Sequence, residues 1–311
     1  MRRRTAVLGM LMTGLACGAE RAKLGATGKA AAPAPPPGPP PTAATAASPA
    51  SDAALVLRAQ ALGAALAGRG FTVMIEPPFV VAGDEAPMKV AKRAATTIRW
   101  STRRLKEAYF KEDPEEIIEI YLFRDAGSYH RHAMELFDER PDSPYGYYSP
   151  SHKALIMNIS TGGGTLVHEI VHPFIRANFP GCPSWFNEGL ASLYEQCDDR
   201  DGQIVGLTNW RLPGLQEAIR ARTLRPLSDL CATSSDEFYD EASSGTNYAQ
   251  ARYVCHYLQE HGLLREFYRQ FVATAAVEPT GRTLLAQMVG YIDIDRFDAD
   301  WRQYALGLVY G

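Results

Sequence analysis

The stretch Thr165-Leu-Val-His168-Glu169-Ile-Val-His172 decides how this chain is organised. Residues four apart lie on the same face of a helix, so the imidazoles of His168 and His172 can reach a single metal ion. Glu169 is one position further round the helix, which places its carboxylate beside the metal, where it can take a proton from water. Apolar residues occupy the other faces, so we expect a buried helix.

The flanks of this stretch predict where its helix begins and ends. Gly162-Gly163-Gly164 breaks the preceding strand, and Thr161 or Thr165 is the candidate residue that caps the helix start. Pro173 directly follows His172, where its ring clashes with the carbonyl of Glu169 and removes one hydrogen bond. The sequence therefore predicts a kink or an early helix end at this proline.

A third metal ligand is needed, because catalytic zinc sites use three protein ligands and leave the fourth position open for water. A second helical pattern, Trp185-Phe-Asn187-Glu188-Gly-Leu-Ala191, starts after a turn rich in Gly and Pro. Fifteen residues separate His172 from Glu188. Glu188 is therefore the candidate third ligand.

The pattern H-E-x-x-H followed by W-x-N-E-G-L-A resembles the gluzincin zinc metallopeptidases. Within them it is similar to the M1-like peptidase MA superfamily, which includes DUF1570-type bacterial proteins. The resemblance implies an α+β, zincin-like fold with a small mixed sheet, an active-site helix and an α-helical C-terminal subdomain. It also implies one catalytic Zn²⁺ held by His168, His172 and Glu188, with Glu169 as general base and a peptide or protein as substrate.

Tyr248 is the second candidate catalytic residue. It opens an amphipathic helical pattern up to Leu258, much as the transition-state tyrosine opens a comparable helix in M1 enzymes. By this resemblance its phenol would donate to the oxyanion of the tetrahedral intermediate. The alternative is that Tyr248 is only a half-buried aromatic residue at a helix start.

Two features of the family pattern are missing from this chain. No G-A-M-E-N-like segment precedes the metal helix, so nothing anchors a substrate's free amine, and we expect an endopeptidase. Ser192 stands four positions after Glu188, where an acidic residue would orient a ligand histidine. Glu195 and Asp198 are the candidates to replace it.

The first fifty residues carry a targeting pattern. Residues 1–17 combine three arginines, an apolar run and small residues, which is typical of an export signal. Leu15-Ala16-Cys17 resembles a bacterial lipobox, so we expect a lipid anchor at Cys17, with simple cleavage nearby as the alternative. Residues 18–51 are rich in Ala and Pro and are expected to form a disordered tether. The predicted location is the bacterial cell envelope, lipid-anchored or periplasmic, with secretion as the alternative.

The remaining chain is long enough for one large domain or two packed subdomains. We expect an α/β subdomain over residues 52–161 and an α-helical subdomain with the metal helices over 162–311. A net charge of −3 over 311 residues gives no sign of nucleic-acid binding. The expected elements are helices at 51–68, 87–110, 126–137, 248–261, 263–276, 281–289 and 295–308, strands at 71–75, 79–81 and 116–123, and loops at 224–230 and, exposed over the site, 236–245.

A hairpin is expected directly before the metal helix. Tyr147-Tyr148 and the run from Ala154 to Ile159 form its strands, with a turn at Ser149-Pro150-Ser151. By the resemblance, this edge hairpin would line the cleft and pair with an extended substrate. The alternative is that the two strands only close the sheet.

The remaining histidines and cysteines do not suggest a second metal site. His130 and His132 are two positions apart on a helix and face apart, so we expect both at the surface, and His256 is expected to be a packed core residue. Apart from Cys17, an even number of cysteines remains in an exported chain, which makes two disulfides plausible with three possible connectivities. These cysteines are Cys182, Cys197, Cys231 and Cys255.

Two functions remain open at this point. The first is a zinc metallopeptidase, in which Glu169 has a role as base. The second is a non-catalytic zinc-binding envelope lipoprotein that holds a peptide or protein partner in the same cleft. Hydrolysis of a non-peptide amide by the same zinc chemistry has the least support.

Overall fold

The computed structural model describes residues 51–310. The predicted export signal, Cys17 and all but the last residue of the predicted tether lie outside the described residues. The elements up to the sheet's last strand are α1 (Asp52–Ala65), β1 (Thr72–Glu76), β2 (Phe79–Gly83), α2 (Pro87–Arg93), the π-helix η1 (Ala94–Arg99), α3 (Trp100–Ala108), β3 (Ile118–Phe123), α4 (Ala126–Phe137), β4 (Gly146–Ser149) and β5 (Ala154–Asn158). Most of the expected helices and strands are confirmed to within a few residues.

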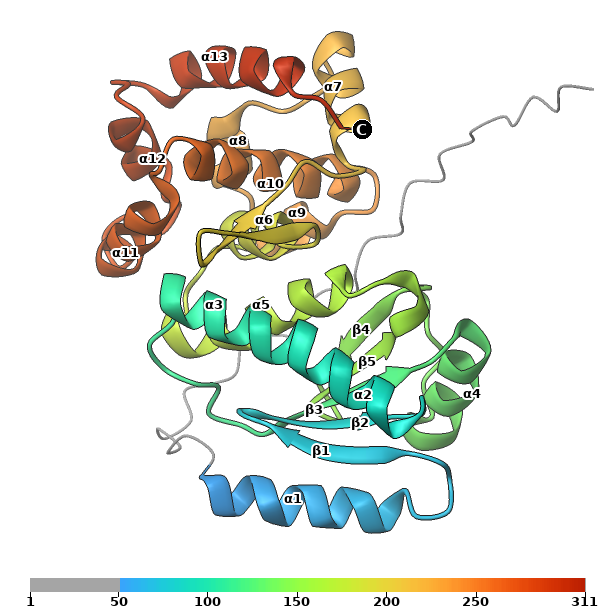
Figure 1. Ribbon diagram of the computed structural model, residues 1–311. Coiled ribbons are helices and arrows are strands. Elements are labelled where there is room, and N and C mark those ends of the chain that lie inside the picture. The colour runs from blue at the N-terminus through green and yellow to red at the C-terminus, as the bar shows by residue number, and fades with distance from the viewer. Residues whose placement is uncertain (1–50, 311) are drawn as a thin grey trace, which may run out of the picture. The chain divides into compact units, whose positions relative to one another are not determined.

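Five strands form one mixed sheet in the order β1-β2-β3-β5-β4 (Figure 1). The three inner strands are parallel, whereas β1 and β4 pair antiparallel at the two edges. The predicted hairpin before the metal helix is confirmed, because β4 pairs with β5 in register from Gly146 opposite Met157 to Ser149 opposite Ala154. Strand β4 is therefore an edge of the sheet.

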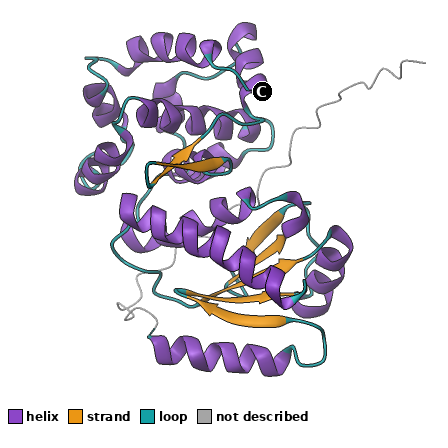
Figure 2. Ribbon diagram, in the orientation of Figure 1, coloured by secondary structure: helices purple, strands orange, loops and turns teal. Residues whose placement is uncertain are grey.

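The sheet separates two layers of helices, as Figure 2 shows. Successive side chains of a strand point to opposite faces. Phe79 and Val81 pack into the larger core with α3 and α5, while Val80 and Ala82 pack into a smaller core with α1 and α4. Because β2 is buried on both faces, its sequence is a continuous apolar run.

The long helical pattern expected over residues 87–110 contains a π-helix. It starts as α2, becomes the π-helix η1 over Ala94–Arg99, and continues as α3 to Ala108. A Cβ built on Gly163 would lie 3.1 Å from the Thr97 side chain, so η1 packs closely against the start of the metal helix. Helical patterns in a sequence do not distinguish this extra residue per turn from an ordinary α-helix.

The rest of the chain is mainly helical. Its elements are the 3₁₀ helix η2 (Ile159–Thr161), α5 (Gly164–Asn178), α6 (Ser184–Leu193), β6 (Cys197–Arg200), β7 (Gln203–Gly206), α7 (Leu212–Ala221), α8 (Leu227–Cys231), α9 (Ser235–Tyr239), α10 (Ser244–Glu260), α11 (Leu264–Thr274), α12 (Arg282–Met288) and α13 (Ile294–Gly307). Three expectations were wrong in detail: α8 and α9 are short helices where loops were expected, and α10 begins four residues before Tyr248. The two-stranded hairpin β6-β7 was not expected.

Helix α5 differs from its prediction at both ends. Its N-cap residue is Gly163, which offers no side-chain hydrogen bond, so neither Thr161 nor Thr165 caps it. The helix also continues through Pro173 to Asn178, so the expected early end was wrong. The residues after the proline, Phe174 and Ile175, are buried in the larger core, and this packing outweighs one lost backbone hydrogen bond.

The predicted disulfides were also wrong. Cys182, Cys197, Cys231 and Cys255 are all free. Cys231 and Cys255 are buried, where a thiol packs as a small apolar group. An even number of cysteines does not bring pairs of Cα atoms within the narrow separation that a disulfide requires.

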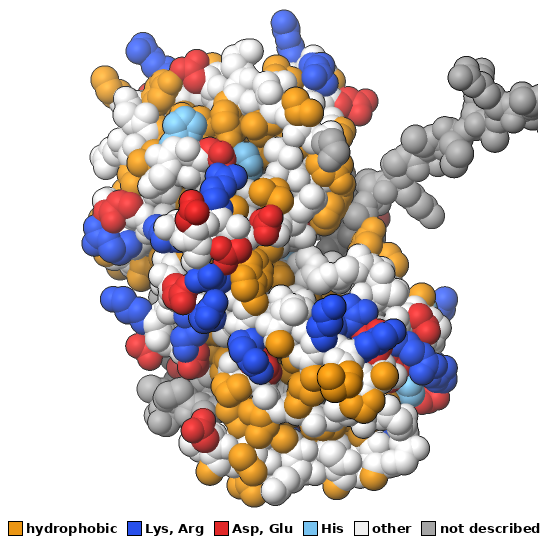
Figure 3. All heavy atoms as spheres, viewed as in Figure 1, with side chains coloured by type: hydrophobic (Ala, Val, Ile, Leu, Met, Phe, Trp, Pro, Cys, Tyr) orange, Lys and Arg blue, Asp and Glu red, His pale blue; other side chains and the backbone are white. Residues whose placement is uncertain are grey.

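The fold is therefore α+β, as expected. Within residues 51–310, no helix combines the length and the apolar character needed to cross a membrane. Figure 3 shows one face of the molecule, on which basic and acidic side chains are interspersed rather than gathered by sign.

Candidate metal centre

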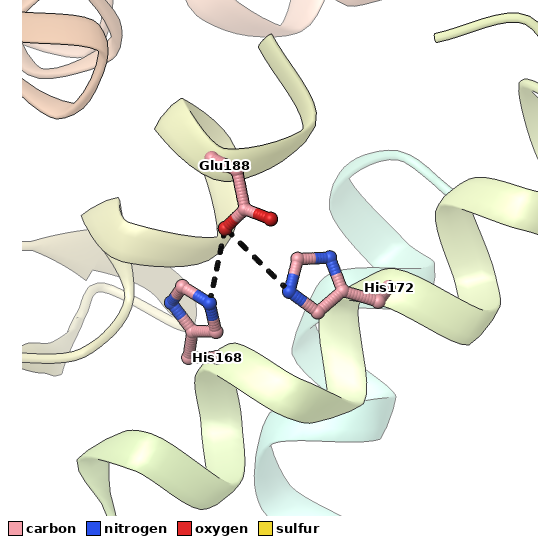
Figure 4. A group of neighbouring side chains, drawn as sticks. All are labelled: His168, His172 and Glu188. Carbon is pink, nitrogen blue, oxygen red and sulfur yellow. Dashed lines mark ion pairs between the residues drawn. The ribbon is translucent and has the colours of Figure 1, made fainter. Parts of the chain in front are cut away.

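His168, His172 and Glu188 converge on one point (Figure 4). Glu188 Oε2 lies 3.2 Å from His168 Nε2 and 3.7 Å from His172 Nε2. One ligand atom from each of the three residues lies within 4.8 Å of the other two. Ligands bound to zinc at about 2.1 Å with tetrahedral angles are about 3.4 Å apart, so these separations suit a single ion.

Two helices bring the three side chains together. His168 and His172 lie one turn apart on α5, and Glu188 comes from α6, which packs on both α5 and α10. The contact between α6 and α10 is close at Gly189, where an added Cβ would lie 2.8 Å from the Ala251 carbonyl oxygen. A larger residue there would push α6 away from α10 and displace Glu188.

The start of α5 is also in close contact with the chain that follows α6. A Cβ built on Gly164 would lie 2.0 Å from the carbonyl oxygen of Glu195, just beyond the end of α6. Only glycine permits this approach. The glycines around the motif thus fix the distance between the helix that carries the histidines and the chain that follows Glu188.

Each ligand histidine has a partner for its other ring nitrogen. His172 Nδ1 lies 3.0 Å from Asn187 Oδ1, and His168 Nδ1 lies 3.3 Å from Glu195 Oε1. The His172 contact is a hydrogen bond, whereas the His168 contact is an ion pair. We assign the proton to Nδ1 in both rings, because the oxygen that each Nδ1 faces can act only as an acceptor. This assignment leaves the Nε2 lone pairs directed at the shared point, as in carboxylate-histidine-metal arrangements.

Glu195 takes the place of the acidic residue that is missing at position 192. Of the two candidates named from the sequence, only Glu195 reaches a ligand, whereas Asp198 is exposed on β6. Arg211 holds the Glu195 carboxylate with two hydrogen bonds, from Nε at 2.8 Å and from a terminal nitrogen at 2.7 Å. The Asn209 amide adds a third at 3.1 Å.

The donors show what the centre can bind. His168 Nε2 and Glu188 Oε2 are buried, and neither has a hydrogen-bond partner among residues 51–310. Two imidazoles and a carboxylate are also the ligand set of catalytic zinc sites.

No family model matches this chain, and no curated protein matches it. What the centre can do therefore follows from its own side chains.

Burial and charge act against each other at the ligands. Burial disfavours the charged form of Glu188, but His172, His168 and Tyr239 outweigh it and lower the pKa of Glu188 to about 2. Burial likewise opposes charge on His168, yet Glu188 and Glu195 raise its pKa above the ordinary value.

Glu169 lies close enough to the three ligands to be affected by their charge. Only 4 % of its surface is exposed, and no residue within 51–310 donates a hydrogen bond to it. Burial raises the pKa of its carboxyl group, with the two ligand histidines opposing that effect. A carboxylate with a raised pKa and free oxygens is suited to accept and return a proton.

Tyr248 also lies at the centre. Its ring stacks on the His168 ring with centroids 6.4 Å apart, and the Arg211 guanidinium lies 5.2 Å from the Tyr248 ring centroid. The buried hydroxyl has no hydrogen-bond partner among the described residues. Burial and the Glu188 carboxylate raise the pKa of Tyr248 well above its usual value, so the hydroxyl keeps its proton and remains a donor.

Three residues of the centre had been given no role from the sequence. Asn187 directly precedes Glu188 in the W-x-N-E-G-L-A pattern, and this position next to a candidate ligand is the one sequence feature that could have identified it. Arg211 and Tyr239 reach the centre from separate segments, and Tyr239 donates to Glu188 Oε1 at 2.7 Å. No local pattern marks either of them.

The other histidines lie elsewhere. His256 is buried against Tyr304, with its Nδ1 2.7 Å from the hydroxyl, so its prediction as a core residue is confirmed. His130 is exposed as expected, but His132 is only 7 % exposed, so its surface prediction was wrong. His132 lies on the face of α4 that packs on the sheet and stacks on Phe123, with centroids 5.5 Å apart.

Proposed function

We propose that this protein is a zinc-dependent peptidase of the gluzincin type that hydrolyses internal bonds of a peptide or protein substrate. The observation that carries the proposal is the set His168, His172 and Glu188 within 4.8 Å of one another, with the buried Glu169, which accepts no hydrogen bond from residues 51–310, next to His168 in the chain. A protein that only holds zinc has no need for a buried carboxylate at this position.

Zinc is the ion that these donors suit. Structural zinc sites are closed by four protein ligands, whereas catalytic sites have three and an open position. A bound zinc ion would supply here a water of lowered pKa and a positive charge for the developing oxyanion. His168, His172 and Glu188 would hold it, with Glu195 and Asn187 orienting the two imidazoles.

Glu169 carries the proton transfers in this proposal. It takes one proton from the attacking water as the water oxygen bonds to the scissile carbonyl carbon. It then returns that proton to the nitrogen of the leaving amine as the carbon-nitrogen bond breaks. Burial raises the pKa of Glu169 towards neutral pH. A group that both accepts and donates a proton is most effective when its pKa lies near the working pH.

Tyr248 is the proposed donor to the oxyanion. Its hydroxyl is buried, protonated and without another partner in the described part of the chain, so no existing bond has to break before it donates. The stacking of its ring on His168 keeps it next to the metal ligands.

The sheet edge offers a place for an extended substrate. Among residues 51–310, strand β4 has a neighbouring strand on one side only, and β4 contacts α5. Exposure increases along one face of α5, from His168 through His172 to Arg176, whose guanidinium lies 5.0 Å from the Tyr148 ring centroid on β4. We propose that the substrate backbone pairs with β4 and reaches the metal from this side.

A zincin-like fold and an envelope location are further parts of the same proposal. A mixed sheet with an antiparallel edge strand beside the histidine helix, followed by a mainly helical remainder, is what the resemblance implies. The pattern of residues 1–17, with Cys17 as the proposed anchor, supports export from the cytoplasm.

The proposal is tested with a diverse peptide library. The full-length protein is loaded with zinc and the digest is analysed by mass spectrometry, with Glu169→Gln in parallel. We expect internal cleavage by the wild type, unchanged zinc content in the variant, and at least about a 100-fold loss of turnover, because general acid-base catalysis contributes that much or more.

Two results would count against the proposal in different ways. Substantial hydrolysis by Glu169→Gln would remove Glu169 from the role of base. A folded, zinc-bound wild type that cleaves no peptide would favour the non-catalytic zinc-binding lipoprotein.

A further inference from the structure

The two carboxylate oxygens of Glu188 have different surroundings. Oε2 faces Nε2 of both ligand histidines, at 3.2 Å and 3.7 Å. Oε1 accepts a hydrogen bond from the Tyr239 hydroxyl at 2.7 Å. The side chain of Glu188 is 2 % exposed, so no bulk water competes for either oxygen.

Tyr239 is held in place by the short segment that carries it. Helix α9 begins with a capping box in which Ser234 and Glu237 satisfy each other's backbone groups. Phe238 is fully buried and packs on Tyr248 with ring centroids 5.3 Å apart. The Asn247 amide donates to the Phe238 carbonyl at 2.9 Å, which ties α9 to α10.

The hydroxyl of Tyr239 remains a donor. A carboxylate oxygen can only accept, so the phenol hydroxyl is the donor in its 2.7 Å contact with Glu188 Oε1. A donor on Oε1 draws negative charge to that oxygen and fixes the rotation of the carboxylate. Oε2 then stays directed at the point that the two histidines share.

We propose that Tyr239 is a positioning residue for the third metal ligand, fixing Glu188 so that only Oε2 faces the ion. This inference rests on the proposed metal binding but not on peptidase activity. It assigns a role to α9, which has no other contact with the metal ligands among the hydrogen bonds of the described residues. Orienting partners of this kind typically change metal affinity by about 10- to 100-fold.

Tyr248 provides a matched control. It is a second buried tyrosine at the same centre, with its ring centroid 6.3 Å from that of Tyr239, but its hydroxyl makes no hydrogen bond within residues 51–310. The two tyrosines therefore have separable roles: Tyr239 acts on the ligand, and Tyr248 remains free for the oxyanion.

The experiment compares Tyr239→Phe with Tyr248→Phe in the full-length protein. Zinc affinity is measured by competition with a chromophoric chelator, and cobalt(II) is substituted for zinc so that its visible absorption reports the coordination geometry. The unfolding midpoint of each metal-free variant checks that the aromatic packing is intact. Asn247→Ala, which frees α9 without removing the phenol, is a second route to the same effect.

We expect Tyr239→Phe to weaken zinc binding by about 10-fold or more and to change the cobalt spectrum. Tyr248→Phe should stay within about 3-fold of the wild type and keep the spectrum, because its hydroxyl makes no bond to a ligand. Asn247→Ala should, like Tyr239→Phe, weaken zinc binding and change the cobalt spectrum.

Equal affinity and an identical cobalt spectrum for Tyr239→Phe and the wild type would overturn this role. A wild type that binds neither ion would overturn the metal centre together with this inference. Zinc binding that depends on Tyr239, without any peptide cleavage, would leave the inference intact and reject only the peptidase.

Discussion

Replacing Arg211 with methionine should destabilise the protein by leaving a buried carboxylate without its cation. The Glu195 side chain is 6 % exposed and that of Arg211 is 17 % exposed. Two hydrogen bonds, at 2.8 Å and 2.7 Å, join them. Arg211 lowers the pKa of Glu195 against the effect of burial, so the carboxylate is charged at neutral pH and remains so only with a partner.

The magnitude follows from the partners that remain. Removing one member of a buried ion pair typically costs about 3 to 5 kcal/mol. Glu195 would keep the Asn209 amide at 3.1 Å and His168 Nδ1 at 3.3 Å, so we expect the lower end, about 3 kcal/mol. In a chain of this size that loss lowers the unfolding midpoint by roughly 6 to 12 °C.

The double variant Glu195→Gln/Arg211→Met separates the charge from the packing. It removes the charge from both partners, and the amide oxygen at position 195 can still accept from His168. We expect it to recover most of the lost stability, because replacing both members of a buried pair is often close to neutral. Zinc affinity should remain below that of the wild type, because a neutral amide orients His168 less strongly than a carboxylate.

The assay is urea unfolding of the zinc-free protein at pH 7, with wild type, single variant and double variant side by side. A loss below about 1 kcal/mol for Arg211→Met would refute the reasoning, as would a double variant that is less stable than the single one. Either result would mean that Glu195 is not a buried charge that depends on Arg211.

Three further predictions concern acid, thiols and metal. Burial lowers the pKa of His256 from 6.5 to about 4, so between these values the unfolded chain binds a proton that the folded protein does not. Stability should therefore fall as the pH drops, by about 2 kcal/mol from pH 7 to pH 5, and urea unfolding of His256→Gln should show less of this loss. Alkylation of the unfolded chain without reductant, followed by mass spectrometry, should label all four cysteines beyond residue 51; a disulfide-linked peptide would contradict the free thiols. Adding zinc should raise the unfolding midpoint with increasing zinc concentration, since a ligand that binds only the folded state stabilises it, and His172→Ala should abolish the rise.

Local geometry explains why much of this protein was predictable. The positions of strands β2, β3 and β5, the edge hairpin and helix α4 follow from apolar periodicity and turn residues, which act within a few positions. The pairing of His168 with His172 follows from the pitch of one helix. Pro173 misled the prediction of where α5 ends, because the packing of its last turn outweighs a local backbone cost.

Other errors share one cause: the burial of a side chain depends on which element of the fold packs against it, and the local sequence does not show this. His132 was expected at the surface, but it lies on the face of α4 that packs against the sheet. Four cysteines suggested two disulfides, but the fold places them as free thiols, two of them buried as apolar groups. The π-helical segment η1 and the hairpin β6-β7 carried no distinctive local pattern.

The sequence by itself determined that two imidazoles and a carboxylate share one helical stretch and that Glu188 follows on a second helix, because helical spacing is fixed by the backbone. Only the tertiary structure decided how these groups are held. Tyr239 reaches Glu188 across 51 residues of chain, and Arg211 reaches Glu195 across 16. Such contacts arise when helices pack and remove polar atoms from water, so that each buried atom must find its partner wherever the fold brings one.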